Sequence, residues 1–277
     1  MKKFLLGSLL LLIGTFLPAN AQERVVSLST QDGWKLSARY LPGREGSKMV
    51  ILLHDIGKTH SAFEAFTDKL AIRGIGYLVL DLRGHGASTS KGLYTSFAKE
   101  GVDNEYNQMS RDVSAAIEYL LNLGISEQNI FLIGVGMGAN VAAKSVSLWP
   151  DIGGLALLTP VTNFRDVLPI PALRVYKGLV FIAAAADDKK TFLEASVMRN
   201  VAFLSSGEGR VTFATAYDKK GHELLDSWVA PELLQWLQTP QKPEVLPDVL
   251  PERNSEESGF VPPEFPIDED TLIPSVL

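Results

Sequence analysis

Short apolar runs alternate with amphipathic and polar segments along most of this chain. Continuous apolar runs predict strands that are buried on both faces, and they fall at 49–54, 77–82, 130–134, 154–159, 179–185 and 211–216. Two further strands, 25–29 and 35–41, flank the turn Gln31-Asp32-Gly33 and predict a hairpin.

Helical patterns lie between these strands. The sequence Ser61-Ala62-Phe63-Glu64 is a capping box, and Phe63, Phe66 and Leu70 form the apolar stripe of the helix it opens. A second amphipathic helix carries Met109, Val113, Ile117, Leu120 and Leu121 and ends at Gly124. A last helix is predicted from Glu223 to Leu237. Because strands and helices alternate, we expect one α/β domain over 22–238. It should hold a mostly parallel, twisted sheet of about eight strands with helices on both faces.

The first 21 residues have the pattern of a cleavable signal peptide. Lys2 and Lys3 precede an apolar run from Phe4 to Leu17, and Ala19-Asn20-Ala21 is an A-x-A cleavage signal. The run is shorter than the ~20 residues that span a bilayer, so we expect cleavage after Ala21 and no stable membrane anchor. The chain has no cysteine. We therefore expect a periplasmic or secreted protein held together by its core alone.

From Thr239 onward prolines and acidic residues dominate, which predicts a disordered acidic tail over 239–277. The formal net charge is −6, and the body of the chain is close to neutral. A near-neutral body lacks the basic footprint that nucleic acid requires. The tail could bind a partner, for example through Ser275-Val276-Leu277 in a carboxylate-binding groove, or it could be solvated with no partner.

The stretch Gly134-Val135-Gly136-Met137-Gly138 follows an apolar strand and precedes a helix of small residues. Strand, sharp turn and helix in this order form the nucleophile elbow G-x-S-x-G, but here the central residue is Gly136. The same stretch also fits G-x-G-x-x-A, a dinucleotide fingerprint. No acid follows at the end of the next strand, 155–159, so the second interpretation is the weaker one.

The ends of the other predicted strands complete a set of motifs. His54 and Gly57 follow one strand, Asp81 to Ser88 reads D-x-R-G-x-G-x-S, Asp187 follows the strand from Leu179, and His222 precedes the last helix. This set resembles the α/β-hydrolase superfamily, specifically its small serine hydrolases, over roughly residues 25–237. The resemblance implies Asp187 as the triad acid, His222 as the base, and oxyanion-hole positions at Ile56 and Met137. The short connection between the strands at 154–159 and 179–185 leaves no room for a lid domain.

Two departures oppose the activity that the resemblance implies. Gly136 has no side chain with which to attack a carbonyl carbon. Asp55, where the family often has glycine, puts a carboxylate beside the oxyanion hole. We therefore expect an exported pseudo-hydrolase that acts by binding a ligand or partner. The alternative is an active esterase, lysophospholipase or peptidase that uses a displaced nucleophile or a water activated by His222.

Other hydroxyls and ligand sets give weaker candidates. Ser61 is expected as a helix cap, Ser88 as a loop residue and Ser145 as a helix residue, while Thr159 is the hydroxyl nearest the elbow. Either Asp187 or Asp188 could pair with His222, and the sequence does not distinguish the two. The four histidines, His54, His60, His85 and His222, do not fall at metal-ligand spacing, so neither a metal nor a cofactor is predicted.

Overall fold

The computed structural model describes residues 22–238. The predicted signal peptide and the predicted acidic tail lie outside these residues.

One sheet of eight strands runs through the described chain in the order β1-β2-β4-β3-β5-β6-β7-β8. The hairpin of β1 and β2 is antiparallel, β2 pairs with β4 antiparallel, and the remaining pairs are parallel. The strands are β1 (Arg24–Ser29), β2 (Lys35–Leu41), β3 (Met49–Leu53), β4 (Gly76–Leu80), β5 (Ile130–Val135), β6 (Gly154–Leu158), β7 (Leu179–Ala185) and β8 (Val211–Ala216). The predicted hairpin and parallel sheet are confirmed.

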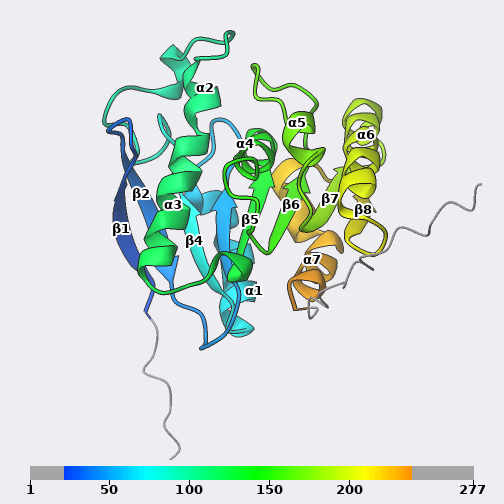
Figure 1. The fold of residues 1–277 in the computed structure, drawn as a ribbon, viewed down its shortest axis with the longest axis horizontal. Helices are drawn as coiled ribbons and strands as arrows, with labels where there is room; N and C mark the ends of the chain where they lie inside the picture. Colours follow the sequence, from blue (N-terminus) through cyan, green and yellow to red (C-terminus); the bar gives the residue numbers. More distant parts are fainter. Residues whose placement is uncertain (1–21, 239–277) are drawn as a thin grey trace, which may run out of the picture. The chain divides into compact units, whose positions relative to one another are not determined.

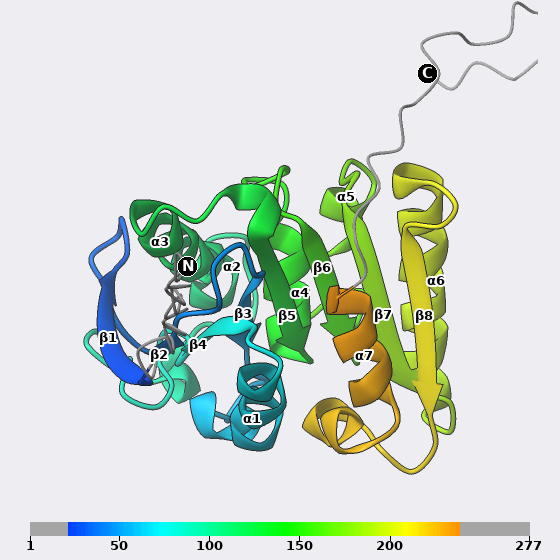
Figure 2. The same ribbon diagram turned by 90° about the horizontal axis from the view of Figure 1, so that it is seen from below.

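Helices cover both faces of the sheet (Figures 1 and 2). The α-helices are α1 (Glu64–Ile72), α2 (Glu105–Gln108), α3 (Ser110–Asn122), α4 (Met137–Ser145), α5 (Ile170–Leu173), α6 (Lys189–Ser206) and α7 (Val229–Gln238). Helices α3 to α6 pack on one face, where Val113, Val141 and Met198 belong to one apolar cluster. Helices α1 and α7 pack on the other, where Phe66 and Leu233 belong to a second. All residues of β3, β4, β5 and β6 are buried, which accounts for their continuous apolar sequences.

The connection from β6 to β7, residues 159–178, holds only the short helix α5. No lid domain is inserted there, as the sequence predicts. Within residues 22–238, no helix is long and apolar enough to cross a membrane.

Two predicted local structures were wrong. Thr59, and not Ser61, caps the helical segment, because the Thr59 side chain accepts a hydrogen bond from the Ser61 N–H at the start of a 3₁₀ turn, His60–Phe63. The last helix does not run unbroken from Glu223. A 3₁₀ segment, Gly221–Asp226, comes first, Ser227 is extended, and α7 begins at Val229. His222 therefore lies in a 3₁₀ turn before the helix.

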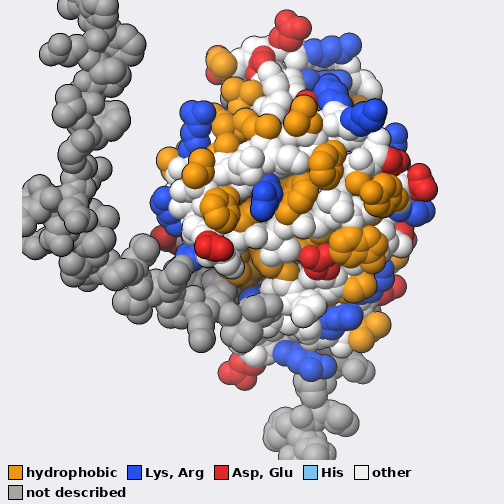
Figure 3. Space-filling view, turned by 90° about the vertical axis from the view of Figure 1, so that its right-hand side faces the viewer, with side chains coloured by type: hydrophobic (Ala, Val, Ile, Leu, Met, Phe, Trp, Pro, Cys, Tyr) orange, Lys and Arg blue, Asp and Glu red, His pale blue; other side chains and the backbone are white. Residues whose placement is uncertain are grey.

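Strand β8 is an edge of the sheet, and α6 packs beside it. Figure 3 faces this side of the molecule and shows hydrophobic side chains exposed among polar ones. On α6 the exposed apolar residues are Leu193, Val197, Phe203 and Leu204. Because these apolar residues are exposed while others on α6 are buried, the sequence of this helix has no clear apolar stripe.

Candidate active site

The turn between β5 and α4 has the sharp geometry of a nucleophile elbow. Gly136 has φ 54° and ψ −118°, a conformation that side-chain-bearing residues rarely adopt, and its N–H donates to the Leu158 carbonyl at 2.9 Å. A Cβ at Gly134 would overlap the Gly138 backbone, and a Cβ at Gly138 would overlap the Leu53 carbonyl. The outer glycines therefore allow the helix to approach the strands closely.

The carboxyl group of Asp55 fills the space beside Gly136. Any Cβ at position 136 would overlap the Asp55 Cγ and both carboxyl oxygens. Asp55 Oδ1 accepts hydrogen bonds from the Ile56 N–H and the Met137 N–H, each at 2.8 Å. These are the two donors predicted to form the oxyanion hole. A carboxylate from the same chain thus occupies both donors and the place of the absent nucleophile.

His222 lies close enough to this centre for the Asp55 charge to act on it. Burial lowers the pKa of His222 to about 4, while Asp55 acts to raise the pKa and Lys58 to lower it further. The ring packs edge-on against Phe63, with centroids 4.9 Å apart. Its Nε2 is buried and has no hydrogen-bond partner among residues 22–238. At neutral pH the ring is therefore uncharged and can accept a proton.

The predicted triad acid has other contacts. Asp187 is exposed, and its Oδ1 accepts a hydrogen bond from the Asp218 N–H at 3.2 Å. Asp188 caps α6 by accepting from the Thr191 N–H and hydroxyl. These bonds from Thr191 lower the pKa of Asp188. Within residues 22–238, neither aspartate has a hydrogen bond or ion pair with His222.

Each candidate hydroxyl has a structural contact. Ser88 donates to the Asp81 carbonyl at 2.5 Å and accepts from the Ser37 N–H, and Ser145 donates to the Val141 carbonyl. The Ser61 hydroxyl lies against that of Thr59. Thr159 Oγ1 accepts from the Gly221 N–H at 2.9 Å, which places it one residue from His222. Thr159 also has φ 54°, a strained value for a β-branched residue.

The loops after β3 and β4 are fixed to each other by buried histidine and aspartate side chains. His54 Nε2 accepts from the Leu82 N–H at 3.0 Å, and its Nδ1 donates to the Asp55 carbonyl at 2.8 Å. Asp81 accepts from the backbone N–H groups of His60 and Ala87. His54 thus holds the backbone of Asp55 at the elbow, a positioning role that the motif alone did not reveal.

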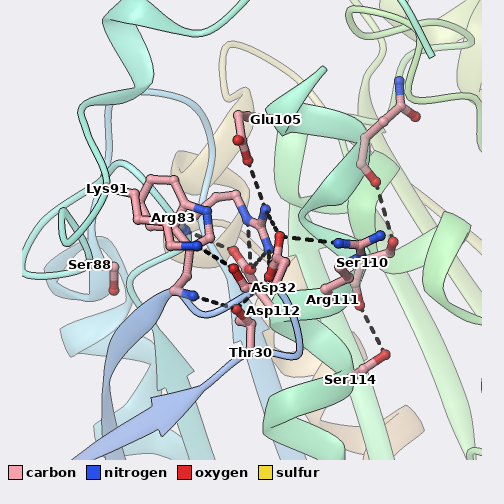
Figure 4. A network of polar contacts seen from close by, with 12 residues as sticks. Thr30, Asp32, Arg83, Ser88, Lys91, Glu105, Ser110, Arg111, Asp112 and Ser114 are labelled. Atoms are coloured by element: carbon pink, nitrogen blue, oxygen red, sulfur yellow. Dashed lines mark hydrogen bonds and ion pairs between the residues drawn. The ribbon is translucent and has the colours of Figure 1, made fainter. Parts of the chain in front are cut away.

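Arg83 of the D-x-R-G segment is completely buried and pairs with three carboxylates (Figure 4). Its guanidinium lies 2.7 Å from Asp112, 2.7 Å from Asp32 and 2.8 Å from Glu105. It also lies over the Trp34 ring, 5.4 Å from the centroid. Burial alone would lower the pKa of Arg83, but the Asp112 charge and the hydrogen bonds that Arg83 donates to the three carboxylates outweigh burial and raise it.

Asn140 is a site residue that the sequence did not single out. Its side-chain amide donates to the Val161 and Val167 carbonyls, and its Oδ1 accepts from the Val161 N–H. It is completely buried on α4, one turn after the elbow. A polar residue in a run of small apolar ones was the available signal. Asn140 fixes the loop that follows β6 against the elbow.

The dinucleotide interpretation does not fit this geometry. A pyrophosphate would bind at the N-terminus of the helix after the glycines, but the Met137 N–H there already binds the Asp55 carboxylate. Among residues 22–238, no group of three or more His, Cys, Asp or Glu side chains could hold a metal ion.

Comparisons with known proteins identify the family. The family described as serine aminopeptidase, S33 matches residues 44–207. A search of curated proteins found no match. An esterase of Pyrococcus furiosus, Pf2001, superposes with a TM-score of 0.61 at 19% identity, covering 78% of this chain and 89% of that one. The esterase EaEST of Exiguobacterium antarcticum superposes with a TM-score of 0.60 at 15% identity, covering 78% of this chain and all of that one.

A putative α/β hydrolase of Agrobacterium tumefaciens, ATU1826, gives a TM-score of 0.59 at 18% identity, covering 77% of this chain and 93% of that one. At these identities the superpositions establish the fold, while the family match spans more than half of the chain. The chain belongs to the serine aminopeptidase S33 family of α/β hydrolases.

Proposed function

We propose that this chain is an exported α/β-hydrolase-fold protein that does not carry out the acyl transfer of its family and acts by binding a ligand or a partner. One observation carries the proposal. Gly136 stands where the nucleophile belongs, and the Asp55 carboxylate occupies the two oxyanion-hole donors beside it.

Acyl transfer needs an attacking atom and free donors for the developing oxyanion. At this centre the attacking side chain is absent, and both donors already hold a negatively charged oxygen. A substrate carbonyl would have to displace Asp55, and the displaced carboxylate would then lie beside the new oxyanion. Asp187 also accepts a hydrogen bond from the Asp218 N–H, and within the described residues 22–238 it makes none with His222. These features together support a binding role.

The direct test uses the protein purified from the periplasm or the medium. It should hydrolyse short-chain nitrophenyl esters no faster than buffer and should not be labelled by a fluorophosphonate. Ester turnover that disappears in His222→Ala would overturn the proposal.

A reconstruction experiment tests the stated cause. Gly136→Ser alone should stay inactive, because its Cβ overlaps the Asp55 carboxyl group. Asp55→Gly alone should also stay inactive, since it restores the donors without a nucleophile. The double variant restores both and should gain measurable esterase activity and fluorophosphonate labelling. If Gly136→Ser alone is as active as the double variant, the carboxylate does not block the site.

A second candidate function is hydrolysis by a displaced nucleophile or by a water that His222 activates. The buried, unpartnered Nε2 of His222 favours it, because this atom is uncommitted within residues 22–238. The hydroxyls of Ser61, Ser88 and Ser145 are bonded elsewhere. The Thr159 hydroxyl is the candidate nucleophile, because it accepts from the N–H of Gly221, the residue before His222. Thr159→Val would remove any activity that depends on this hydroxyl while keeping the shape of the side chain.

A further inference from the structure

We propose that Asp55 is a carboxylate nucleophile that attacks sp3 carbons carrying a leaving group which departs as an anion, such as primary alkyl halides. This inference goes beyond the proposed binding role. It concerns the same group of residues around Gly136 and Asp55, and it agrees with the proposed function that the protein does not carry out serine-type acyl transfer.

The geometry gives the two carboxyl oxygens of Asp55 different environments. Oδ1 is held by the N–H groups of Ile56 and Met137 at 2.8 Å each. Within residues 22–238, Oδ2 accepts no hydrogen bond. The carboxyl group lies where the side chain of residue 136 would project, which is where the fold presents its attacking atom. One oxygen is therefore anchored and the other is available to attack.

The occupied oxyanion hole selects the substrate class. Attack on an ester or amide carbonyl creates a new oxyanion on the substrate, which would need the donors that Asp55 already occupies. Displacement at an sp3 carbon creates no oxyanion. It needs only an oriented nucleophile and a leaving group able to carry the negative charge away. The arrangement thus disfavours acyl substrates and suits alkyl ones.

In the first step Oδ2 forms a bond to the carbon as the carbon–halogen bond breaks. The halide leaves with the bonding electron pair, and an alkyl ester of Asp55 remains. In the second step a water gives one proton to His222 Nε2 while its oxygen attacks the Asp55 Cγ.

The negative charge then develops on Oδ1, which the N–H groups of Ile56 and Met137 already bind. Collapse of this intermediate expels the alcohol oxygen, which takes the proton from His222. The carboxyl group loses its remaining proton to solvent. The sum is alkyl halide plus water giving alcohol, halide and a proton, with no oxidant or metal required. The oxyanion hole acts only in the second step.

The experiment follows 1-bromobutane with the exported full chain. Wild type should release bromide and butanol with saturation kinetics. His222→Gln should stall after the first step, and peptide mass spectrometry should show one added butyl group on the peptide that contains Asp55. A single turnover of wild type in water enriched in oxygen-18 should place the label in the Asp55 carboxyl group, because the water attacks Cγ and not the alkyl carbon.

Asp55→Asn keeps the size and a carbonyl oxygen for the two donors but should release no bromide and form no adduct. Asp151→Asn, an exposed aspartate away from the centre, is the matched control and should behave as wild type. Thermal unfolding of each variant checks that it folds.

Bromide release equal in wild type and Asp55→Asn, or no butyl adduct in a folded His222→Gln protein, would overturn the inference. Either result leaves the proposed lack of acyl transfer standing. Conversely, ester turnover by wild type would overturn that proposal without affecting the adduct measurement.

Discussion

Asp55 and Gly136 depend on each other through space. The glycine leaves the volume that the carboxyl group fills, and the carboxyl group binds the N–H that begins α4. The position of the Asp55 carboxyl group therefore requires a glycine at 136. A side chain at 136 would expel the carboxylate from its two donors, and loss of the carboxylate would leave those donors unbonded at the centre.

A double-mutant cycle measures this dependence. Gly136→Ala adds only a Cβ, and it should destabilise the fold through backbone strain of about 1–3 kcal/mol and through overlap with Asp55, which adds a similar amount. In an Asp55→Ala background the overlap is gone, so the same Gly136→Ala change should cost only the strain. Chemical denaturation of the four proteins gives the coupling free energy. Strictly additive effects would show that the two residues do not share this space.

Buried His54 makes the stability of the fold depend on pH. Burial lowers the pKa of His54 to about 3, although the hydrogen bond to the Asp55 carbonyl acts to raise it. In the unfolded chain the pKa is about 6.5, so between pH 6.5 and 3 the unfolded state binds a proton that the folded state does not. The resulting stability is fully present above pH 6.5 and is lost as the pH falls toward 3.

We expect His54→Gln to be less stable than wild type at pH 7 and to lose less stability on acidification. One proton fewer should be taken up on unfolding near pH 5, measured from the slope of the unfolding free energy against pH. In wild type, His54 should lower the free energy of unfolding by at most about 4–5 kcal/mol as the pH falls from 6.5 to 3. His222, whose pKa burial also lowers, contributes in the same direction and persists in the variant. An unchanged slope would contradict the assignment of a neutral His54.

At the residue scale, only part of this centre could be predicted from the sequence. The sequence located Gly136 and the donors Ile56 and Met137, because the strand–turn–helix pattern fixes their positions relative to the elbow. The sequence showed that the negative charge of Asp55 would oppose a developing oxyanion. It did not show that the Asp55 carboxylate itself binds the two oxyanion-hole donors. That contact joins residues 82 positions apart, and the rotamer that makes it is set by the absence of a side chain at 136. The roles of Asp187 and His222 as an acid–base pair stay a prediction.

At the scale of elements, Arg83 joins four segments that are distant in sequence. Asp32 comes from the turn between β1 and β2, Glu105 from α2, Asp112 from α3, and Arg83 from the loop after β4 (Figure 4). This cluster ties the antiparallel edge of the sheet to the helix that covers it. Because the Arg83 and Asp112 side chains are fully buried, each requires the other's charge.

Removing Arg83 should therefore be strongly destabilising. Arg83→Gln leaves Asp112 buried without its cation and should lower the free energy of unfolding by about 3–5 kcal/mol. Arg111 is the matched control, since it is 44% exposed and lies 3.5 Å from the same Asp32. Arg111→Gln should cost less than about 1 kcal/mol. If Arg83→Gln and Arg111→Gln lowered the free energy of unfolding in urea equally, burial of the Arg83–Asp112 pair would not be the reason that Arg83 stabilises the fold.

The sequence predicted the strands better than the ends of the helices. Continuous apolar runs specify buried parallel strands wherever they fit, and every predicted strand is present. The capping box at Ser61 was wrong because the chain makes a 3₁₀ turn from Thr59 before α1. The last helix starts later than predicted because residues 221–226 form a separate turn, which Gly221 begins by donating its N–H to Thr159. Local patterns do not contain such tertiary contacts.

At the scale of the whole molecule, two apolar clusters lie on opposite faces of one sheet, and residues 22–238 build both. Every strand pairing in the sheet also falls within this range. The described segment therefore has the core and the hydrogen bonding of an independently folding domain.

A chain shortened to residues 22–238 should therefore keep the stability of one covering 22–277. We expect unfolding free energies that agree within about 0.5 kcal/mol, the size typical of changes remote from core features, together with equal rates of bromide release from 1-bromobutane. The same preparations test export, because mass spectrometry of the full chain recovered from the periplasm or medium should find Gln22 at its start.

Binding of a partner through 239–277 would be lost in the shortened chain without any change in the fold, which separates a tail function from a function of the active-site region. A shortened chain that unfolds more easily than the chain covering 22–277 would instead assign the tail a structural role.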